Sequence, residues 1–172
     1  MQNDNLKSYL HLHVIVFIWG FTAILGKLIS LEALDLVWYR MLFASVIMTF
    51  VVLLNKEKVK VPFHIFIGFL LCGIIIAAHW LTFYQAIKVS NVSITLACLS
   101  TGAFFASILE PIFYKRKVIW YEVLFGLVVV GGLYIIFNVE GDYYLGIILA
   151  LTSAFLSALF SVINWKYAKM YD

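Results

Sequence analysis

Six apolar runs of about twenty residues each constrain the fold more than any other feature of the sequence. They cover residues 12–31, 34–54, 63–86, 94–114, 118–137 and 145–164. About twenty apolar residues in a helix cross the roughly 30 Å of hydrocarbon in a bilayer. We therefore predict an all-α integral membrane protein, a polytopic helical bundle with about six transmembrane helices.

The composition agrees with this prediction. Hydrophobic residues make up 65% of the 172, against about 45–50% in soluble domains. A transmembrane barrel would alternate apolar and polar residues in segments of about ten, whereas these runs are continuous. The first run follows a short polar start, as in a signal peptide, but its length and the lack of a cleavage site favour a retained first span.

Basic residues gather in every second connection. Nine of the twelve lie at the amino end, in the second and fourth connections and in the tail: Lys7; Lys56, Lys58 and Lys60; Lys115, Arg116 and Lys117; Lys166 and Lys169. The first and fifth connections are acidic, with Glu32, Asp35, Glu140 and Asp142. Because short basic loops remain cytoplasmic, we predict a multi-pass protein with both ends of this chain in the cytoplasm. The net charge of +3 then belongs to membrane loops, so the expected partner is the lipid bilayer and not nucleic acid.

Two cations lie within or beside the outer ends of the spans. Lys27, near the end of the first span, could be an interfacial anchor or could contact a substrate. Arg40, in the second span, could snorkel outward, could pair with Glu32 or Asp35, or could bind an anionic group through its planar fork.

The third span contains His79, with Trp80 and Tyr84 following it on a neighbouring helical face. A histidine at this depth normally faces inward, where it could bind a ligand or relay a proton. The alternative is a neutral imidazole bonded to a hydroxyl or carbonyl of another helix. Both interpretations stay open at this stage.

The fourth span ends at Glu110-Pro111, before the basic triplet of residues 115–117. Pro111 cannot donate to the carbonyl of Ser107 and should bend the helix there, which is a reasonable gate position. Glu110 could carry a proton, although a carboxylate one turn from three cations is more often their ion partner. In the sixth span, two parallel stripes of small residues predict packing against protein or a cavity wall: Ala150, Ala154 and Ala158, and Ser153, Ser157 and Ser161.

The sequence contains no enzyme signature. No serine nucleophile elbow or phosphate loop occurs, and His11 and His13 have no carboxylate or cysteine nearby to complete a metal site. We expect neither catalysis nor a cofactor nor a bound metal.

The order and spacing of several motifs resemble the EamA family of the drug/metabolite transporter superfamily. They are Trp19-Gly20 followed by Lys27, Arg40, Tyr84-x-Ala86, Trp120-Tyr121-Glu122 to Gly126, and Gly131-Gly132. The resemblance implies a carrier in the bacterial inner (plasma) membrane, built from two inverted five-helix repeats. Members often have a proline in the middle of the fourth span, where this chain has Thr101-Gly102.

On this resemblance, residues 1–137 form one EamA-like repeat, and residues 138–172 begin a second, incomplete one. An odd five-helix unit must invert when repeated. The chain is then expected to be part of a ten-helix carrier or to pair with another copy as a homodimer.

The resemblance implies transport of a small organic metabolite or amino acid by alternating access, with export as the expected direction. We expect Trp19, Lys27, Arg40, His79 and Tyr84 to line the substrate site, with Glu110 and Pro111 as candidates for proton coupling or gating. Two alternatives remain: a non-transporting membrane scaffold or assembly subunit, and a dimeric small-multidrug-type half-carrier.

Overall fold

The computed structural model describes residues 2–56, 61–139 and 141–169. Its helices are α1 (Gln2–Leu28), α2 (Ala33–Leu54), α3 (Phe63–Val89), α4 (Val92–Leu99), α5 (Gly102–Tyr114), α6 (Trp120–Val139) and α7 (Tyr144–Ala168), with a short 3₁₀ turn, η1 (Gly141–Tyr143), before α7. No strand occurs in these three ranges.

Five segments within the described residues are long and apolar enough to cross a membrane: Leu6–Leu28, Ala33–Leu54, Phe63–Val89, Val92–Tyr114 and Tyr144–Ala168. The apolar part of α6, Trp120–Ile135, is somewhat shorter. The predicted fold class, an all-α polytopic membrane protein with about six spans, is confirmed.

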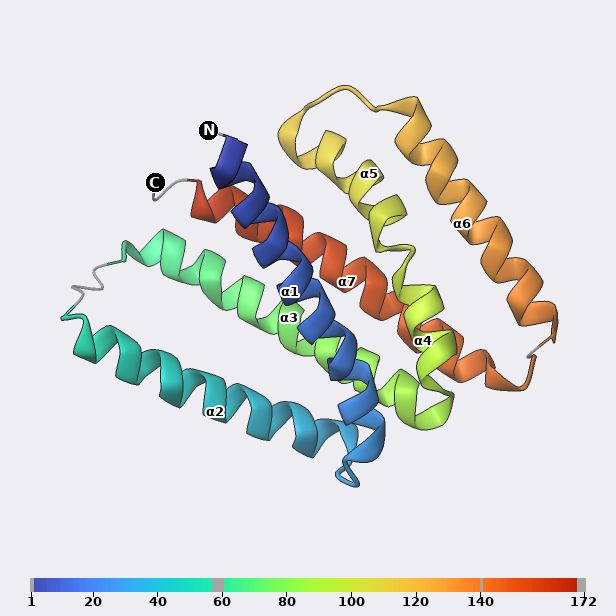
Figure 1. Ribbon diagram of the computed structural model, residues 1–172, viewed down its shortest axis with the longest axis horizontal. Helices are drawn as coiled ribbons and strands as arrows, with labels where there is room; N and C mark the ends of the chain where they lie inside the picture. Colours follow the sequence, from blue (N-terminus) through green and yellow to red (C-terminus); the bar gives the residue numbers. More distant parts are fainter. Residues whose placement is uncertain (1, 57–60, 140, 170–172) are drawn as a thin grey trace.

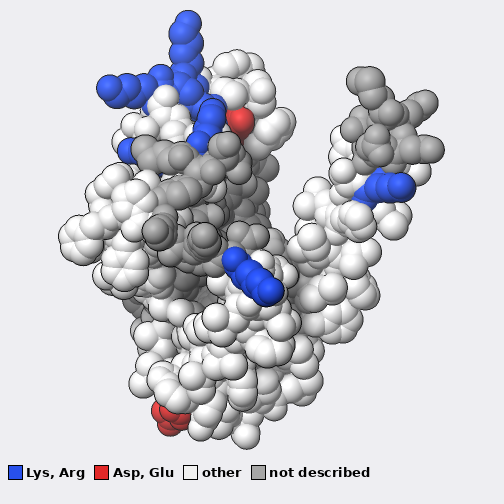
Figure 2. Space-filling view, turned by 90° about the vertical axis from the view of Figure 1, so that its left-hand side faces the viewer, with Lys and Arg blue, Asp and Glu red and all other residues white. Residues whose placement is uncertain are grey.

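The helices run in alternating directions, so their ends collect at two faces of the bundle (Figure 1). The start of α1, the connection between α5 and α6 and the end of α7 share one face, and the connection between α1 and α2 lies at the other. Most of the visible lysine and arginine lies toward the first face, where acidic atoms are also visible, and another acidic group appears at the opposite face (Figure 2). Three residues used in the charge count, Lys58, Lys60 and Glu140, lie outside the described residues. Which face meets the cytoplasm stays a prediction.

The antiparallel pair of α3 and α7 forms the centre of the packing. At one end, Ala86 of α3 packs with Ile147 and Ala150 of α7 and with the buried Cys98 of α4. At the other end, Cys72 and Ile75 pack with Ile163. Since these two clusters lie at opposite ends of the same helix pair, α3 and α7 remain in contact along most of their length.

The small residues of α7 make this close packing possible. Ala150 and Ala154 are completely buried, Ala158 is 6% exposed, and Ser153 is completely buried. Small side chains allow helix backbones to approach closely, which favours helix association where no hydrophobic effect operates. The predicted alanine stripe and Ser153 are therefore packed against protein. In the serine stripe, Ser157 is half-buried, and Ser161 is exposed and lines a cavity.

The fourth span is interrupted at Ser100 and Thr101, between α4 and α5 (Figure 1). Both hydroxyls bond backbone carbonyls three residues earlier, from Ser100 to Ala97 at 2.6 Å and from Thr101 to Cys98 at 2.6 Å. Such bonds compete with the regular helical ladder. Pro111, where the sequence predicts a bend, lies inside α5, and that helix continues to Tyr114. The interruption thus falls where the sequence has Thr101-Gly102.

The amino-terminal half of α1 stands away from the other helices. Every residue from Leu6 to Gly20 is exposed, and Figure 2 shows a lobe separated from the main body by an open hollow. Contact with the bundle begins further along, at Ala23, which is 1% exposed. One side of the bundle is therefore open between α1 and the α3–α7 pair.

The close approach of α3 and α7 generates a test. A methyl group added at Gly146 would lie 2.5 Å from the Ser90 Cβ, whereas one added at Gly73 would meet nothing within 4 Å. Both changes to alanine gain helix propensity, but overpacking costs about 1–3 kcal/mol. We expect Gly146→Ala to lower the thermal unfolding temperature in detergent relative to Gly73→Ala. Equal unfolding temperatures would contradict the packing described here.

Candidate functional site

Arg40, near the start of α2, contacts Tyr84, near the end of α3, where the two helices pack together. The Arg40 Nη1 donates a hydrogen bond to the Tyr84 hydroxyl. The guanidinium carbon lies 4.3 Å from the centroid of the Trp80 ring and 6.0 Å from that of Tyr84. Because Trp80 and Tyr84 are four residues apart on α3, their side chains lie on the same side of that helix and hold the arginine between them.

Arg40 lines a cavity of about 330 Å³ between α1, α2 and α3. Its wall is mainly apolar and aromatic, and Arg40 is the charged residue in it: Thr22, Leu25, Gly26, Ile29, Leu36, Tyr39, Arg40, Phe43 and Tyr84. An apolar cavity with a few convergent polar groups is the usual form of a small-molecule site. The cavity is partly open, since Leu25, Tyr39 and Phe43 are exposed, and it is a binding-site candidate because it contains Arg40 and Tyr84, two of the predicted substrate residues.

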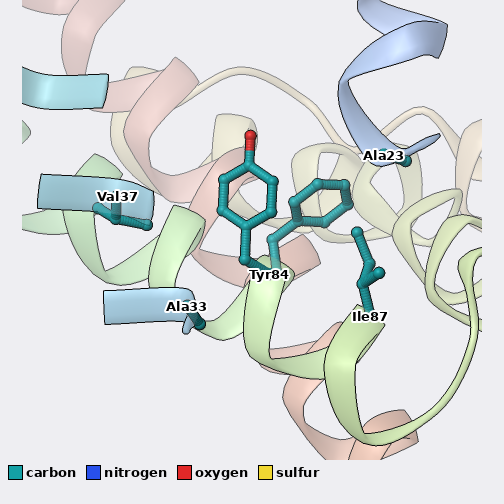
Figure 3. Close-up of a cluster of buried hydrophobic side chains, with 6 residues drawn as sticks. Ala23, Ala33, Val37, Tyr84 and Ile87 are labelled. Atoms are coloured by element: carbon teal, nitrogen blue, oxygen red, sulfur yellow. The ribbon is translucent and has the colours of Figure 1, made fainter. Parts of the chain in front are cut away.

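A buried cluster fixes the position of Tyr84. Tyr84 is 3% exposed and packs with Ala23 of α1, Ala33 and Val37 of α2 and Ile87 of its own helix (Figure 3). The small residues at the helix ends leave room for its ring. Gly26 shows how tight the fit is, because a methyl group there would lie 2.5 Å from the Tyr84 ring. The phenol is thus held in place before any ligand arrives.

Arg40 retains an uncompensated positive charge. An arginine within a span costs roughly 2.5–3.5 kcal/mol on insertion scales. Stacking on Trp80 returns about 0.5–2 kcal/mol, and a hydrogen bond to a charged group about 1.5–3. The carboxylates of Glu32 and Asp35, its expected partners, are not within 4.0 Å, since the ion pairs of the described residues involve Arg116. Its charge is solvated by neutral groups alone.

Lys27 lies outside this cavity. Its side chain is exposed and its Nζ lies 3.3 Å from the Ile87 carbonyl in the last turn of α3. In the reverse sense, Lys88 of α3 donates to the carbonyl of Ile29, just beyond α1. Cations are favourable at the carboxyl ends of helices. The two lysines therefore join the ends of α1 and α3.

His79 turns toward α7 and is 8% exposed. Its Nδ1 lies 2.9 Å from both the Ser153 carbonyl oxygen and the Ser153 Oγ. The Ser153 hydroxyl also lies 3.1 Å from the His79 carbonyl. Donation to the backbone carbonyl requires the proton on Nδ1. This leaves Nε2 without a hydrogen bond in the described structure, so one ring nitrogen is used for packing and the other is free to accept.

Trp19 lies apart from both the Arg40 cavity and His79. Its side chain is 70% exposed, and it lies on the part of α1 that stands away from the bundle. It is absent from the cavity wall, which α1 supplies from Thr22 onward. Of the five predicted substrate residues, the structure brings Arg40 and Tyr84 together, while Trp19, Lys27 and His79 lie elsewhere.

Glu110 forms an ion pair at the end of α5. Arg116 Nη2 lies 2.9 Å from a carboxylate oxygen of Glu110 and 2.9 Å from one of Glu122. The hydrogen bond to Glu122, and next the one to Glu110, raise the pKa of Arg116 above its ordinary value. The arginine is therefore charged at any physiological pH and ties α5 to the start of α6. Glu110 also lines a cavity of about 380 Å³ between these helices, one residue before Pro111.

In the described ranges, no three His, Cys, Asp or Glu side chains are grouped as a metal would require. Cys72 and Cys98 are both free thiols and both are buried.

The sequence provides signals for only some of these contacts. Trp80 could be anticipated, because it is one helical turn from Tyr84. Ser153, as the partner of His79, could not, because 74 residues separate the two and the serine stripe of α7 predicts packing without naming its partner. The choice of Arg116, rather than Lys115 or Lys117, as the partner of Glu110 also depends on geometry.

An all-helical bundle of apolar spans, with a charged group embedded beside a small cavity, defines a polytopic membrane protein with a solute-sized site. Residues 6–138 match the model of the EamA-like transporter family. The chain belongs to this family of membrane transporters of the drug/metabolite type. No match was found among curated proteins or among solved structures.

The contact between His79 and Ser153 can be measured. Hydrogen bonds between membrane helices couple by about 0.6 kcal/mol on average in double-mutant cycles. We expect His79→Ala and Ser153→Ala each to destabilise the protein, and the double variant to lose about 0.5–1.5 kcal/mol less than the sum. Unfolding in mixed micelles would provide the free energy of unfolding of the unmodified protein, of each single variant and of the double variant. Strict additivity would contradict the contact between the imidazole Nδ1 and the Ser153 hydroxyl, which is the one contact of the pair that joins two side chains.

Proposed function

We propose that the protein moves a small organic metabolite or amino acid across the bacterial inner membrane, in the direction of export, by alternating access. The observation that carries this proposal is the cavity between α1, α2 and α3, into which Arg40 and the Tyr84 hydroxyl converge. A transporter needs an embedded polar site that a solute can occupy, and ionisable groups inside spans usually mark such pathways.

The order of the helices supports an inverted-repeat mechanism. The family match ends near the carboxyl end of α6, and α7 follows it with the direction opposite to α1. We propose that α7 begins a second repeat. Further helices of that repeat, from the same polypeptide or from a second copy, would pack at the open side beside α1. Rocking of one repeat against the other would then expose the site alternately.

His79 enters the proposal as a residue between the two repeats. Its Nδ1 bond to Ser153 links α3 to α7, and Nε2 remains available to a solute or a proton. A histidine between the two repeats can couple substrate binding in one repeat to movement of the other. Glu110 and Pro111, near the α5–α6 connection, are proposed as a gate that Arg116 holds closed.

A non-transporting scaffold is the second candidate, and one observation favours it. The polar groups of α3 bond other helices, His79 to Ser153 and Tyr84 to Arg40, as in a protein whose polar groups serve packing. The two candidates differ in whether a solute crosses the membrane.

Transport in proteoliposomes tests the proposal. A panel of radiolabelled amino acids and organic acids should include a solute that the protein takes up, with and without a pH gradient. We expect Tyr84→Phe to reduce its flux several-fold, because the hydroxyl that orients Arg40 is lost. Tyr121→Phe, on the exposed surface of α6, is the matched control and should transport normally.

His79→Ala should also reduce flux, in protein that remains folded by circular dichroism. Normal flux in this variant would contradict a role for His79 in transport. Absence of uptake for every solute in the panel would favour the scaffold.

A further inference from the structure

Arg40 lacks a counter-ion in the described structure, and this absence carries information about the solute. Its contacts are the Tyr84 hydroxyl and the faces of two aromatic rings, all electrically neutral. A guanidinium remains charged in any protein environment. A permanent cation in a poorly polarisable site attracts an anion more strongly than it would in water.

The geometry leaves the donors of the guanidinium ready for a ligand. Stacking on Trp80 uses the face of the group, at 4.3 Å from the ring centroid. The bond to Tyr84 uses a proton of Nη1. Neither contact occupies Nε or Nη2, and no other hydrogen bond of this side chain occurs in the described residues. Planar N–H donors of this kind match the two oxygens of a carboxylate.

The remaining wall disfavours a positive charge on the solute. No acidic residue lines the cavity, so an ammonium group would enter without a partner and would be repelled by Arg40. Leu25, Ile29, Leu36 and Phe43 instead offer an apolar surface. At about 330 Å³, the space suits a solute of a few carbon atoms or a single ring.

We propose that the cavity of Arg40 and Tyr84 binds a monocarboxylate with an apolar body and no ammonium group. This inference rests on the proposed function, and it narrows the solute from metabolites and amino acids to anions of this class, which leaves zwitterionic amino acids out. Arg40 binds the carboxylate directly. Tyr84 and Trp80 are positioning residues that hold the guanidinium.

The test compares phenylacetate with phenylacetamide, two probes of similar shape that differ in charge, and with zwitterionic phenylalanine. The protein in nanodiscs is titrated, and tryptophan fluorescence is followed because Trp80 stacks on Arg40; Trp80→Phe identifies its part of the signal. We expect saturable binding of phenylacetate, at least ten-fold weaker binding of both other probes, and loss of this preference in Arg40→Gln. Arg40→Lys, which keeps the charge without the fork, should fall between.

Equal binding of phenylacetate and phenylacetamide by the unmodified protein would overturn the inference, and this comparison needs no variant to fold. Phenylacetate binding that persists unchanged in folded Arg40→Gln would overturn it as well. The transport assay separates the two proposals. Flux of a neutral or cationic solute without carboxylate binding would leave the proposed function standing, whereas carboxylate binding without flux of any solute would support the site and contradict transport.

Discussion

The inability of lipid to form hydrogen bonds is the constraint on which this structure depends. Every polar group inside the bilayer must find a partner in the protein or lie in a cavity that water or a solute can enter. The third helix, α3, carries most of these groups. Tyr84 bonds Arg40 of α2, His79 bonds Ser153 of α7, and Lys88 bonds the end of α1. Their partners lie on three different helices, so the hydrogen bonds made by α3 side chains help to position the helices around it.

The same constraint explains why a site exists at this place. The hydrogen bonds of His79 are reciprocated by another buried group, and that contact is a packing contact. Arg40 is treated differently, because its neighbours solvate the charge without neutralising it. In a cavity beside an incompletely compensated cation, a solute can provide the negative charge that the neighbouring side chains do not. The tight fit of Tyr84 against Gly26 keeps the arginine in place while the cavity is empty.

The sequence predicts most of the fold because hydrophobicity and length act locally. Runs of apolar residues specify the helices, and the alanine stripe of α7 predicts its buried face. The contacts between helices are less accessible. His79 has several possible partners along the chain, and only the antiparallel packing of α3 with α7 selects Ser153. The local rule for Pro111 predicts a bend in the fourth span, yet the span is interrupted at Ser100 and Thr101, where two hydroxyls bond backbone carbonyls.

The candidate site is partly visible in the sequence for the same reason. Arg40 stands out because a charge inside an apolar run is costly, and Tyr84 is found by its place in a family motif. Their contact depends on the angle at which α2 meets α3, which no local pattern encodes. Trp19, chosen from the same motif set, is 70% exposed on the part of α1 that leaves the bundle.

The whole account requires that the chain crosses the bilayer with its basic connections on the cytoplasmic side. Labelling of intact cells with a membrane-impermeant maleimide tests this directly, with single cysteines placed at Asp142 and at Lys117. Both positions are exposed, and the natural cysteines are buried and provide the background. The account predicts that Asp142→Cys is labelled and that Lys117→Cys is labelled only after the membrane is opened. Labelling of Lys117→Cys in intact cells, with Asp142→Cys protected, would contradict it.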